Sequence, residues 1–141
     1  MIRVVIDPGV YVSAFISPRR AAPAIVVEAL LDGHIDALVS PLLLAELARV
    51  LGRTKFERAA SDGRGEAFVA LIAERGLRVE DPPPTPGATD DPDDDYLVAL
   101  ARVHGVEAIV SGDRHLLSVA SDDLRVWLPR ALVDRLQPGS G

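Results

Sequence analysis

Short apolar runs alternate with longer segments of helical period along the whole chain. Runs that predict strands cover residues 2–6, 35–39, 77–79, 106–110 and 124–127. Segments that predict helices cover residues 22–31, 41–51, 65–74, 91–104, 116–120 and 129–136. This alternation predicts an α/β protein, a three-layer α/β/α sandwich whose central sheet has about five mostly parallel strands.

The length and the loops predict a single domain. A chain of 141 residues suits one domain. The stretch 82–90, with four prolines in nine residues, resembles a linker, but the two strands predicted after it would have no partner strands in a separate domain. We therefore expect one domain over residues 1–136, with a proline-stiffened loop inside it and a flexible tail over residues 137–141.

Composition excludes several kinds of protein. The chain has no cysteine, so disulfides, thiol nucleophiles and Cys-ligated metals are ruled out. No apolar stretch approaches the ~20 residues that span a bilayer, and the start of the chain does not resemble a signal peptide. A cytoplasmic protein that does not contact membranes is therefore expected. The net charge of −6 argues against a generic basic nucleic-acid coat, unless the acids are gathered at one site.

Two aspartates follow predicted strands directly or nearly so. Asp7 ends the run 2–6, and Asp113 comes just after the run 106–110. Ligands bind outside the carboxyl ends of parallel strands, so both carboxylates are candidates for a site. Each could instead cap the helix that follows it, because aspartate accepts hydrogen bonds from the free amides of a helix start.

Two further acidic features stand beside apolar helix faces. Glu46 interrupts an otherwise apolar helix, where it either faces a site or pairs on the surface with Arg49 one turn later. Residues 90–95 hold five aspartates in six positions. Helix-start physics explains Asp91 as an N-cap, but Asp95 precedes an apolar face and is expected to lie beside it. A calcium loop starting at Asp91 would need glycine and glutamate at positions held here by Tyr96 and Arg102.

Three stretches together resemble a known family. They are residues 4–7 with 10–15, residues 46–51 with Arg53, Lys55 and Phe56, and residues 91–97 leading through 109–113 to 116–117. Their order and spacing resemble the PIN-domain ribonucleases, and in particular the bacterial VapC-like toxins of type II toxin–antitoxin systems. The resemblance spans nearly the whole chain. It implies a metal-dependent endoribonuclease that hydrolyses RNA phosphodiester bonds.

The resemblance also implies a set of site residues. The family's acidic quartet falls on Asp7, Glu46, Asp95 and Asp113, which would be the catalytic residues and hold Mg²⁺ or Mn²⁺. In this reading Asp7 and Asp113 are direct ligands, Asp95 is a ligand or orients a water, and Glu46 acts directly or through water. Residues that would substitute for the ligands or hydrogen-bond to them are Asp91, Asp94 and Ser111.

One position departs from the family pattern. The first acid is usually followed by a hydroxyl residue and asparagine, whereas Pro8 and Gly9 follow Asp7 here. The missing groups would hydrogen-bond near the metal, so their loss could leave the quartet less well oriented. The alternative function is therefore a catalytically weak or inactive PIN-like module that binds RNA or protein.

A basic segment of the chain is a candidate for binding RNA. The segment after Glu46 is locally basic, and its members that are candidates for binding RNA phosphates are Arg49, Arg53, Lys55 and Arg58. An ordinary solvated helix surface explains each of them individually. The family resemblance further implies a cognate antitoxin protein and a homodimer, to which the apolar helix over residues 22–31 could contribute.

Overall fold

The fold is described from a computed structural model, which covers residues 1–53, 56, 59 and 61–136. The predicted tail over residues 137–141 lies outside these ranges. The five strands are β1 (Ile2–Ile6), β2 (Ile35–Val39), β3 (Leu77–Arg78), β4 (Ala108–Val110) and β5 (Val126–Trp127). Each lies within a run predicted to be a strand, and β3, β4 and β5 are one or two residues shorter than predicted.

The helices follow the predicted alternation with one addition. They are α1 (Pro8–Ile16), α2 (Ala22–Leu31), α3 (Pro41–Leu51), α4 (Arg64–Arg75), α5 (Asp95–His104), α6 (Arg114–Leu117) and α7 (Pro129–Leu136). Two short 3₁₀ turns precede α4 and α5, namely η2 (Ser61–Gly63) and η3 (Pro92–Asp94). The addition is α1, whose apolar residues run around most of its circumference and so show no helical period.

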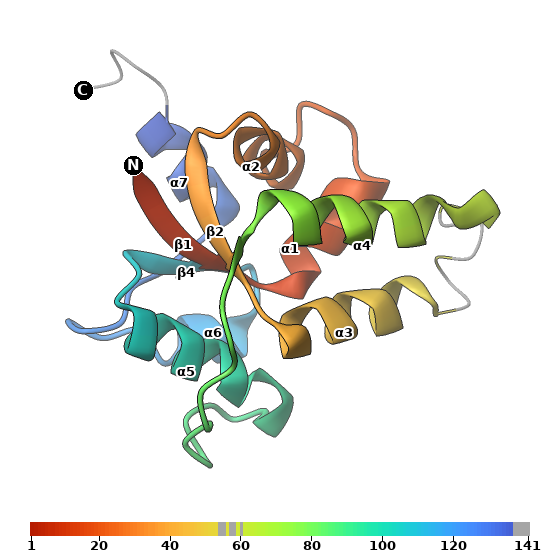
Figure 1. Cartoon of the computed structure of the whole chain (residues 1–141). Helices are drawn as coiled ribbons and strands as arrows, with labels where there is room; N and C mark the ends of the chain where they lie inside the picture. Colours follow the sequence, from red (N-terminus) through yellow and green to blue (C-terminus); the bar gives the residue numbers. More distant parts are fainter. Residues whose placement is uncertain (54–55, 57–58, 60, 137–141) are drawn as a thin grey trace.

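The sheet confirms the predicted fold class. Its strands lie in the order β3-β2-β1-β4-β5, and all four neighbouring pairs are parallel, so the sheet is parallel throughout. Right-handed crossovers in this order place the helices between β1 and β3 on one face and α5 on the other. Figure 1 shows α1 and α4 on one side of the strands and α5 on the other. Burial on both faces explains why β1 and β4 are almost continuously apolar.

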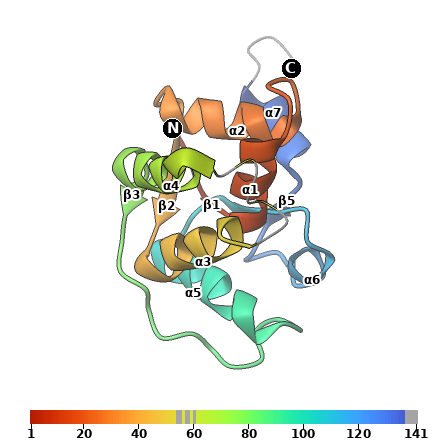
Figure 2. The same ribbon diagram turned by 90° about the vertical axis from the view of Figure 1, so that its right-hand side faces the viewer.

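The helix α2 packs against other helices of the same chain. It contacts α1 and α7, and its residues Val26, Val27, Ala29 and Leu30 are buried. Figure 2 shows α7 beside α2 at the end of the molecule where the N-terminus lies. Much of the apolar surface that suggested a contact between two copies is therefore covered by the chain itself.

The connections between strands define where a ligand can enter. From β1 the chain moves outward to β2 on one side, whereas from β4 it moves outward to β5 on the other. At such a switch point the connections diverge and leave a crevice at the carboxyl ends of the two central strands. The amide of Asp7 donates to the carbonyl of Val110 at 3.0 Å, which holds these two strand ends together.

Candidate active site

A cavity of about 560 Å³ opens at the carboxyl ends of β1 and β4. Five carboxylates line it, contributed by segments that are far apart in the sequence. They belong to Asp7, Glu46, Asp91, Asp94 and Asp113. The structure therefore brings together three of the four residues of the predicted quartet, and adds Asp91 and Asp94 from the predicted supporting set.

Asp7 is held on both of its carboxylate oxygens. Its Oδ1 accepts from the amide of Gly9 at 3.1 Å and caps α1, and its Oδ2 accepts from the hydroxyl of Ser111 at 2.7 Å. Burial raises the pKa of this carboxyl, and the nearby charge of Asp113 adds to the rise, while the two hydrogen bonds oppose it. Asp7 thus caps α1, as one of the two predictions had it, and also lines the cavity.

Ser111 connects the ends of the two central strands. This residue is fully buried, and its hydroxyl accepts from the amide of Asp113 at 2.9 Å while donating to Asp7. Asp113 in turn caps α6, with its Oδ1 accepting from the amide of His115 at 2.8 Å. One hydroxyl therefore fixes the relative positions of Asp7 and Asp113.

Glu46 reaches the cavity from the middle of α3. Its Oε2 accepts from the phenol of Tyr96 at 2.5 Å, and its Oε1 lies 3.8 Å from the guanidinium of Arg49. Burial raises the pKa of Glu46, and the charges of Asp7 and Asp93 act in the same direction, against the Tyr96 hydrogen bond and Arg49. The predicted pairing with Arg49 is present, but the shorter contact is with Tyr96, 50 residues away in sequence.

Asp94 carries the most perturbed carboxyl in the cavity. The residue is 7% exposed, and its Oδ2 is buried with no hydrogen-bond partner. Burial raises the pKa of Asp94 to about 7, and the charges of Asp7, Asp113, Asp91 and Glu46 contribute to the rise. Four neighbouring negative charges disfavour the ionised form of Asp94. A bound cation would therefore stabilise the ionised form of this carboxyl more than that of any other in the cavity.

The structure differs from the prediction at Asp95. Its Oδ1 accepts from the amide and the hydroxyl of Thr89 at 2.8 and 2.9 Å, and its Oδ2 accepts from the amide of Gly87 at 3.2 Å. Asp95 therefore anchors the proline-rich loop and does not line the cavity. The reason is the 3₁₀ turn η3, which replaces the first turn of the predicted helix and brings Asp94 to the cavity in its place.

Asp91 has the predicted capping role. Its Oδ1 accepts from the amide of Asp93 at 3.0 Å at the start of η3, and Pro92 follows in the first position of that turn. The amide of Asp91 also donates to the Thr89 hydroxyl at 3.2 Å. Asp91 lines the cavity as well, so its charge adds to that of the other four acids.

The donor set of the cavity fits a hard divalent cation. Its carboxylate oxygens are the ligands that Mg²⁺ and Mn²⁺ prefer, and one of them, Asp94 Oδ2, is buried without a partner. Within the described residues, no three acidic or histidine side chains are already arranged around a single point where an ion could bind. The carboxylates share one cavity without meeting at one point, so binding an ion would require some of their side chains to move.

The structure describes two of the four residues that were predicted to bind RNA phosphates, Arg49 and Arg53. Arg53 lines the acidic cavity, whereas Arg49 lines an adjoining cavity of about 410 Å³ that shares Glu46 with it. Both arginines are exposed. Lys55 and Arg58 lie outside the described residues.

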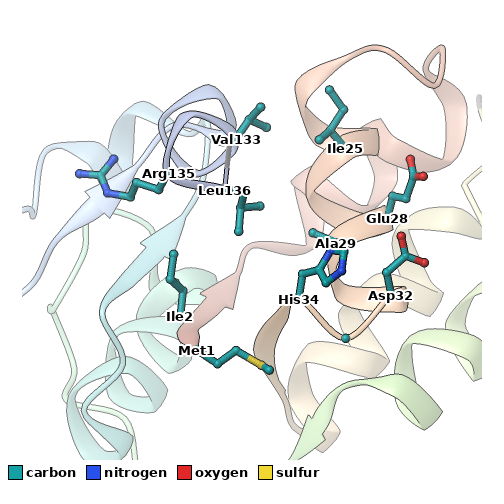
Figure 3. Close-up of a pocket in the computed structure, with 11 residues that line it drawn as sticks. Met1, Ile2, Ile25, Glu28, Ala29, Asp32, His34, Val133, Arg135 and Leu136 are labelled. Carbon is teal, nitrogen blue, oxygen red and sulfur yellow. The ribbon is translucent and has the colours of Figure 1, made fainter. Parts of the chain in front are cut away.

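A larger cavity of about 760 Å³ lies at the opposite end of the strands (Figure 3). Its polar side chains include Glu28, Asp32 and Arg135, which are all exposed, and Figure 3 shows Arg135 pointing away from the cavity. The guanidinium of Arg135 instead stacks on Trp127, 4.0 Å from the ring centroid. This cavity has no buried charged group and lies at the amino ends of the strands, so we place the candidate site at the acidic cavity.

A parallel α/β sheet with an acidic cavity at its switch point defines the class of protein. The PIN domain family model matches residues 3–115, so the chain belongs to the PIN-domain family. No curated protein matches the chain. Within the described residues, no helix combines the length and apolarity needed to cross a membrane.

Solved structures share the fold at low sequence identity. VapBC2 from Rickettsia felis, solved bound to a DNA fragment from its promoter, is 12% identical with a TM-score of 0.60, and the match covers 89% of this chain and 97% of that one. FitAcB from Neisseria gonorrhoeae is 18% identical with a TM-score of 0.57, over 90% and 98% of the chains. PAE2754 from Pyrobaculum aerophilum is 17% identical with a TM-score of 0.57, over 96% and 89%. At these identities the similarity establishes the fold alone.

Proposed function

We propose that this chain is an endoribonuclease that hydrolyses RNA phosphodiester bonds with the help of Mg²⁺ or Mn²⁺. The observation that carries the proposal is the crowding of Asp7, Glu46, Asp91, Asp94 and Asp113 around one cavity, with Asp94 Oδ2 buried and unpartnered. Carboxylates in such a cavity repel one another unless a cation joins them. Membership of the PIN-domain family supports the same chemistry.

The acidic residues of the cavity would have different roles in this reaction. Asp7, Asp94 and Asp113 would hold the cation directly, and Glu46 would complete the set directly or through a water. When bound, a divalent cation lowers the pKa of a coordinated water and stabilises charge that develops on a phosphate. The raised pKa of Asp94 would suit this carboxylate to accept a proton from an attacking water once its side chain has moved toward the cation. In this set of ligands Asp94 replaces Asp95, because the carboxylate oxygens of Asp95 already accept hydrogen bonds from the proline-rich loop.

Substrate binding would depend on the rim of the cavity. Arg53 lines the cavity beside the acids, where its guanidinium can hold a backbone phosphate next to the one that is cleaved. Arg49 would serve the adjoining cavity in the same way. Contacts to phosphates carry no sequence information, so this part of the site would bind RNA without base preference.

The resemblance to VapC-like toxins extends the proposal to a biological role. In this role the chain is the toxin of a type II toxin–antitoxin pair in the cytoplasm, forms a homodimer, and is restrained by a cognate antitoxin. The supporting observations are the PIN-domain match and the fold that the chain shares with VapBC2 and FitAcB.

The direct test is cleavage of end-labelled RNA by the purified chain with Mg²⁺, with Mn²⁺ and with a chelator. Asp7→Asn and Asp113→Asn remove one charge each from the cavity and are expected to lower the cleavage rate at least about 100-fold. Asp32→Asn is a matched control, because this exposed aspartate lies at the opposite end of the strands. It is expected to cleave like the wild type.

The outcomes separate the two candidate functions. Metal-dependent cleavage that both variants lose supports the nuclease. Cleavage that persists in chelator, or that both variants retain, contradicts the mechanism. If the wild type binds RNA but cleaves none, the alternative of a binding module replaces it.

A further inference from the structure

We propose that Tyr96 is a positioning residue that fixes Glu46 relative to Asp94 in the acidic cavity. This inference rests on the proposed function, because it concerns how the same cavity binds its cation. Tyr96 does not line the acidic cavity but lines the adjoining one together with Glu46 and Arg49, so it would act on the acidic cavity through the orientation of Glu46.

The contact has the geometry of a fixed, directional hydrogen bond. The Tyr96 hydroxyl lies 2.5 Å from Glu46 Oε2, and the tyrosine side chain is held in the interior, with only 7% of the residue exposed. A hydroxyl donating to a carboxylate is among the stronger hydrogen bonds in proteins. Arg49, the other partner of Glu46, is 3.8 Å away with a side chain that is 58% exposed, so it constrains the carboxylate far less.

The bond joins two parts of the fold that carry different acids. Glu46 lies on α3, which packs against α1 and α4, whereas Tyr96 lies on α5, which packs against β1 and β4. Because Asp94 comes only two residues before Tyr96, the hydrogen bond sets the position of Glu46 relative to Asp94.

The chemistry of the donor suits this task. A tyrosine keeps its proton at neutral pH, so it orients the carboxylate without neutralising its charge. Glu46 therefore keeps the negative charge that attracts a cation, and both of its oxygens can accept further contacts. A lysine or arginine at position 96 would have oriented the same carboxylate but cancelled its charge.

The test compares Tyr96→Phe with Tyr11→Phe. Each variant removes one hydroxyl from a buried ring, but the Tyr11 hydroxyl has no hydrogen-bond partner in the described structure. Tyr96→Phe is expected to weaken Mn²⁺ binding and lower kcat for RNA cleavage by about 10-fold or more, with KM for RNA little changed. Tyr11→Phe is expected to leave all three values at the wild-type level.

A double-mutant cycle separates positioning from a general loss of structure. In a Glu46→Ala background the tyrosine has no carboxylate to orient, so adding Tyr96→Phe is expected to change kcat and Mn²⁺ affinity less than about two-fold. Full additivity of the two substitutions would overturn the proposal.

A third measurement needs neither metal nor activity. A hydroxyl proton in a short bond to a carboxylate is expected as a slowly exchanging, downfield NMR signal in the metal-free chain. That signal is expected to disappear in both Tyr96→Phe and Glu46→Ala and to persist in Tyr11→Phe. If the signal and the Mn²⁺ affinity are both unchanged in Tyr96→Phe, the positioning role is wrong, whereas a wild type that neither binds Mn²⁺ nor cleaves RNA contradicts the proposed function instead.

Discussion

The hydroxyl of Ser111 donates to Asp7 Oδ2 at 2.7 Å and accepts from the amide of Asp113 at 2.9 Å. This serine therefore links the acids at the ends of the two central strands. The family usually supplies a hydroxyl and an amide directly after the first acid, where this chain has Pro8 and Gly9. Ser111 and the amide of Gly9 hold Asp7 in their absence.

Ser111→Ala is expected to weaken Mn²⁺ binding and RNA cleavage by about 10- to 100-fold, because Asp7 loses the bond that orients it. The free energy of unfolding should fall by about 1 kcal/mol through the lost hydrogen bonds. Isothermal titration, cleavage assays and urea unfolding measure the three effects. Ser118→Ala is the control, since its exposed hydroxyl only contacts the carbonyl of His115. Equal metal affinity in the two variants would contradict the role of Ser111.

Asp94→Asn and Asp95→Asn are expected to separate function from stability. Asp94→Asn should lower cleavage at least about 100-fold while the chain stays folded, because it removes a proposed ligand with no other partner. Asp95→Asn should lower the free energy of unfolding by about 1–3 kcal/mol, because an amide cannot satisfy the donors of Gly87 and Thr89 equally well. Cleavage assays and urea unfolding of both variants decide the assignment. A metal-binding defect confined to Asp95→Asn would restore Asp95 to the site.

Stability without metal is expected to fall as the pH rises from about 4 to about 7. The pKa of Asp94 is about 7 in the folded chain against 3.8 ordinarily, so in this window the folded state holds a proton that the unfolded state has lost. Raising the pH therefore costs folding free energy, and the raised pKa values of Asp7 and Glu46 act with the same sign.

Urea unfolding in chelator at pH 5 and pH 8 measures this effect, which should exceed about 1 kcal/mol. Asp94→Asn should flatten the dependence, because the amide does not titrate. Mn²⁺ should stabilise the wild type more at pH 8 than at pH 5, since binding needs the ionised carboxylates. A wild type that is equally stable at both pH values in chelator would show that the acids are not crowded.

Arg53→Ala is expected to raise KM for RNA several-fold with little change in kcat, because the residue would hold a phosphate beside the reacting one. The slope of log affinity against log salt concentration should become shallower by about one unit. Binding of RNA in calcium, measured at several salt concentrations, checks the slope. Arg135→Ala is the control, because Arg135 stacks on Trp127 far from the acidic cavity. Equal salt slopes for the two variants would remove Arg53 from the interface.

Local patterns predicted most of the fold and part of the set of residues that line the acidic cavity. The strands and most helices follow from short β-branched runs and helical periods, which reflect burial of one face or both. The helix α1 was missed because apolar side chains surround it, so no period distinguishes it from a strand or a loop. Asp7 and Asp113 could be placed because both follow strands that end at one edge of a parallel sheet.

The contacts that sequence could not predict join distant segments. Nothing local distinguishes Asp94 from Asp95, because the choice depends on a 3₁₀ turn and on Thr89, which binds one of them. The bond from Tyr96 to Glu46 spans 50 positions and belongs to no motif. Such pairs are defined by tertiary packing, which a periodicity does not encode.

Hydrogen bonds hold the proline-rich loop at both of its ends. At its start, Asp81 Oδ2 accepts from the amide of Leu42, and at its end Asp95 Oδ1 accepts from the amide of Thr89. The exposed span between these ties, which includes Pro84 and Thr85, contributes nothing to the acidic cavity. The two halves of the chain that it connects meet in the β1–β4 ladder. Asp7 and Asp94 therefore come from two pieces that the sheet would keep together after a cut in the loop, and a nicked chain would behave as one folded unit.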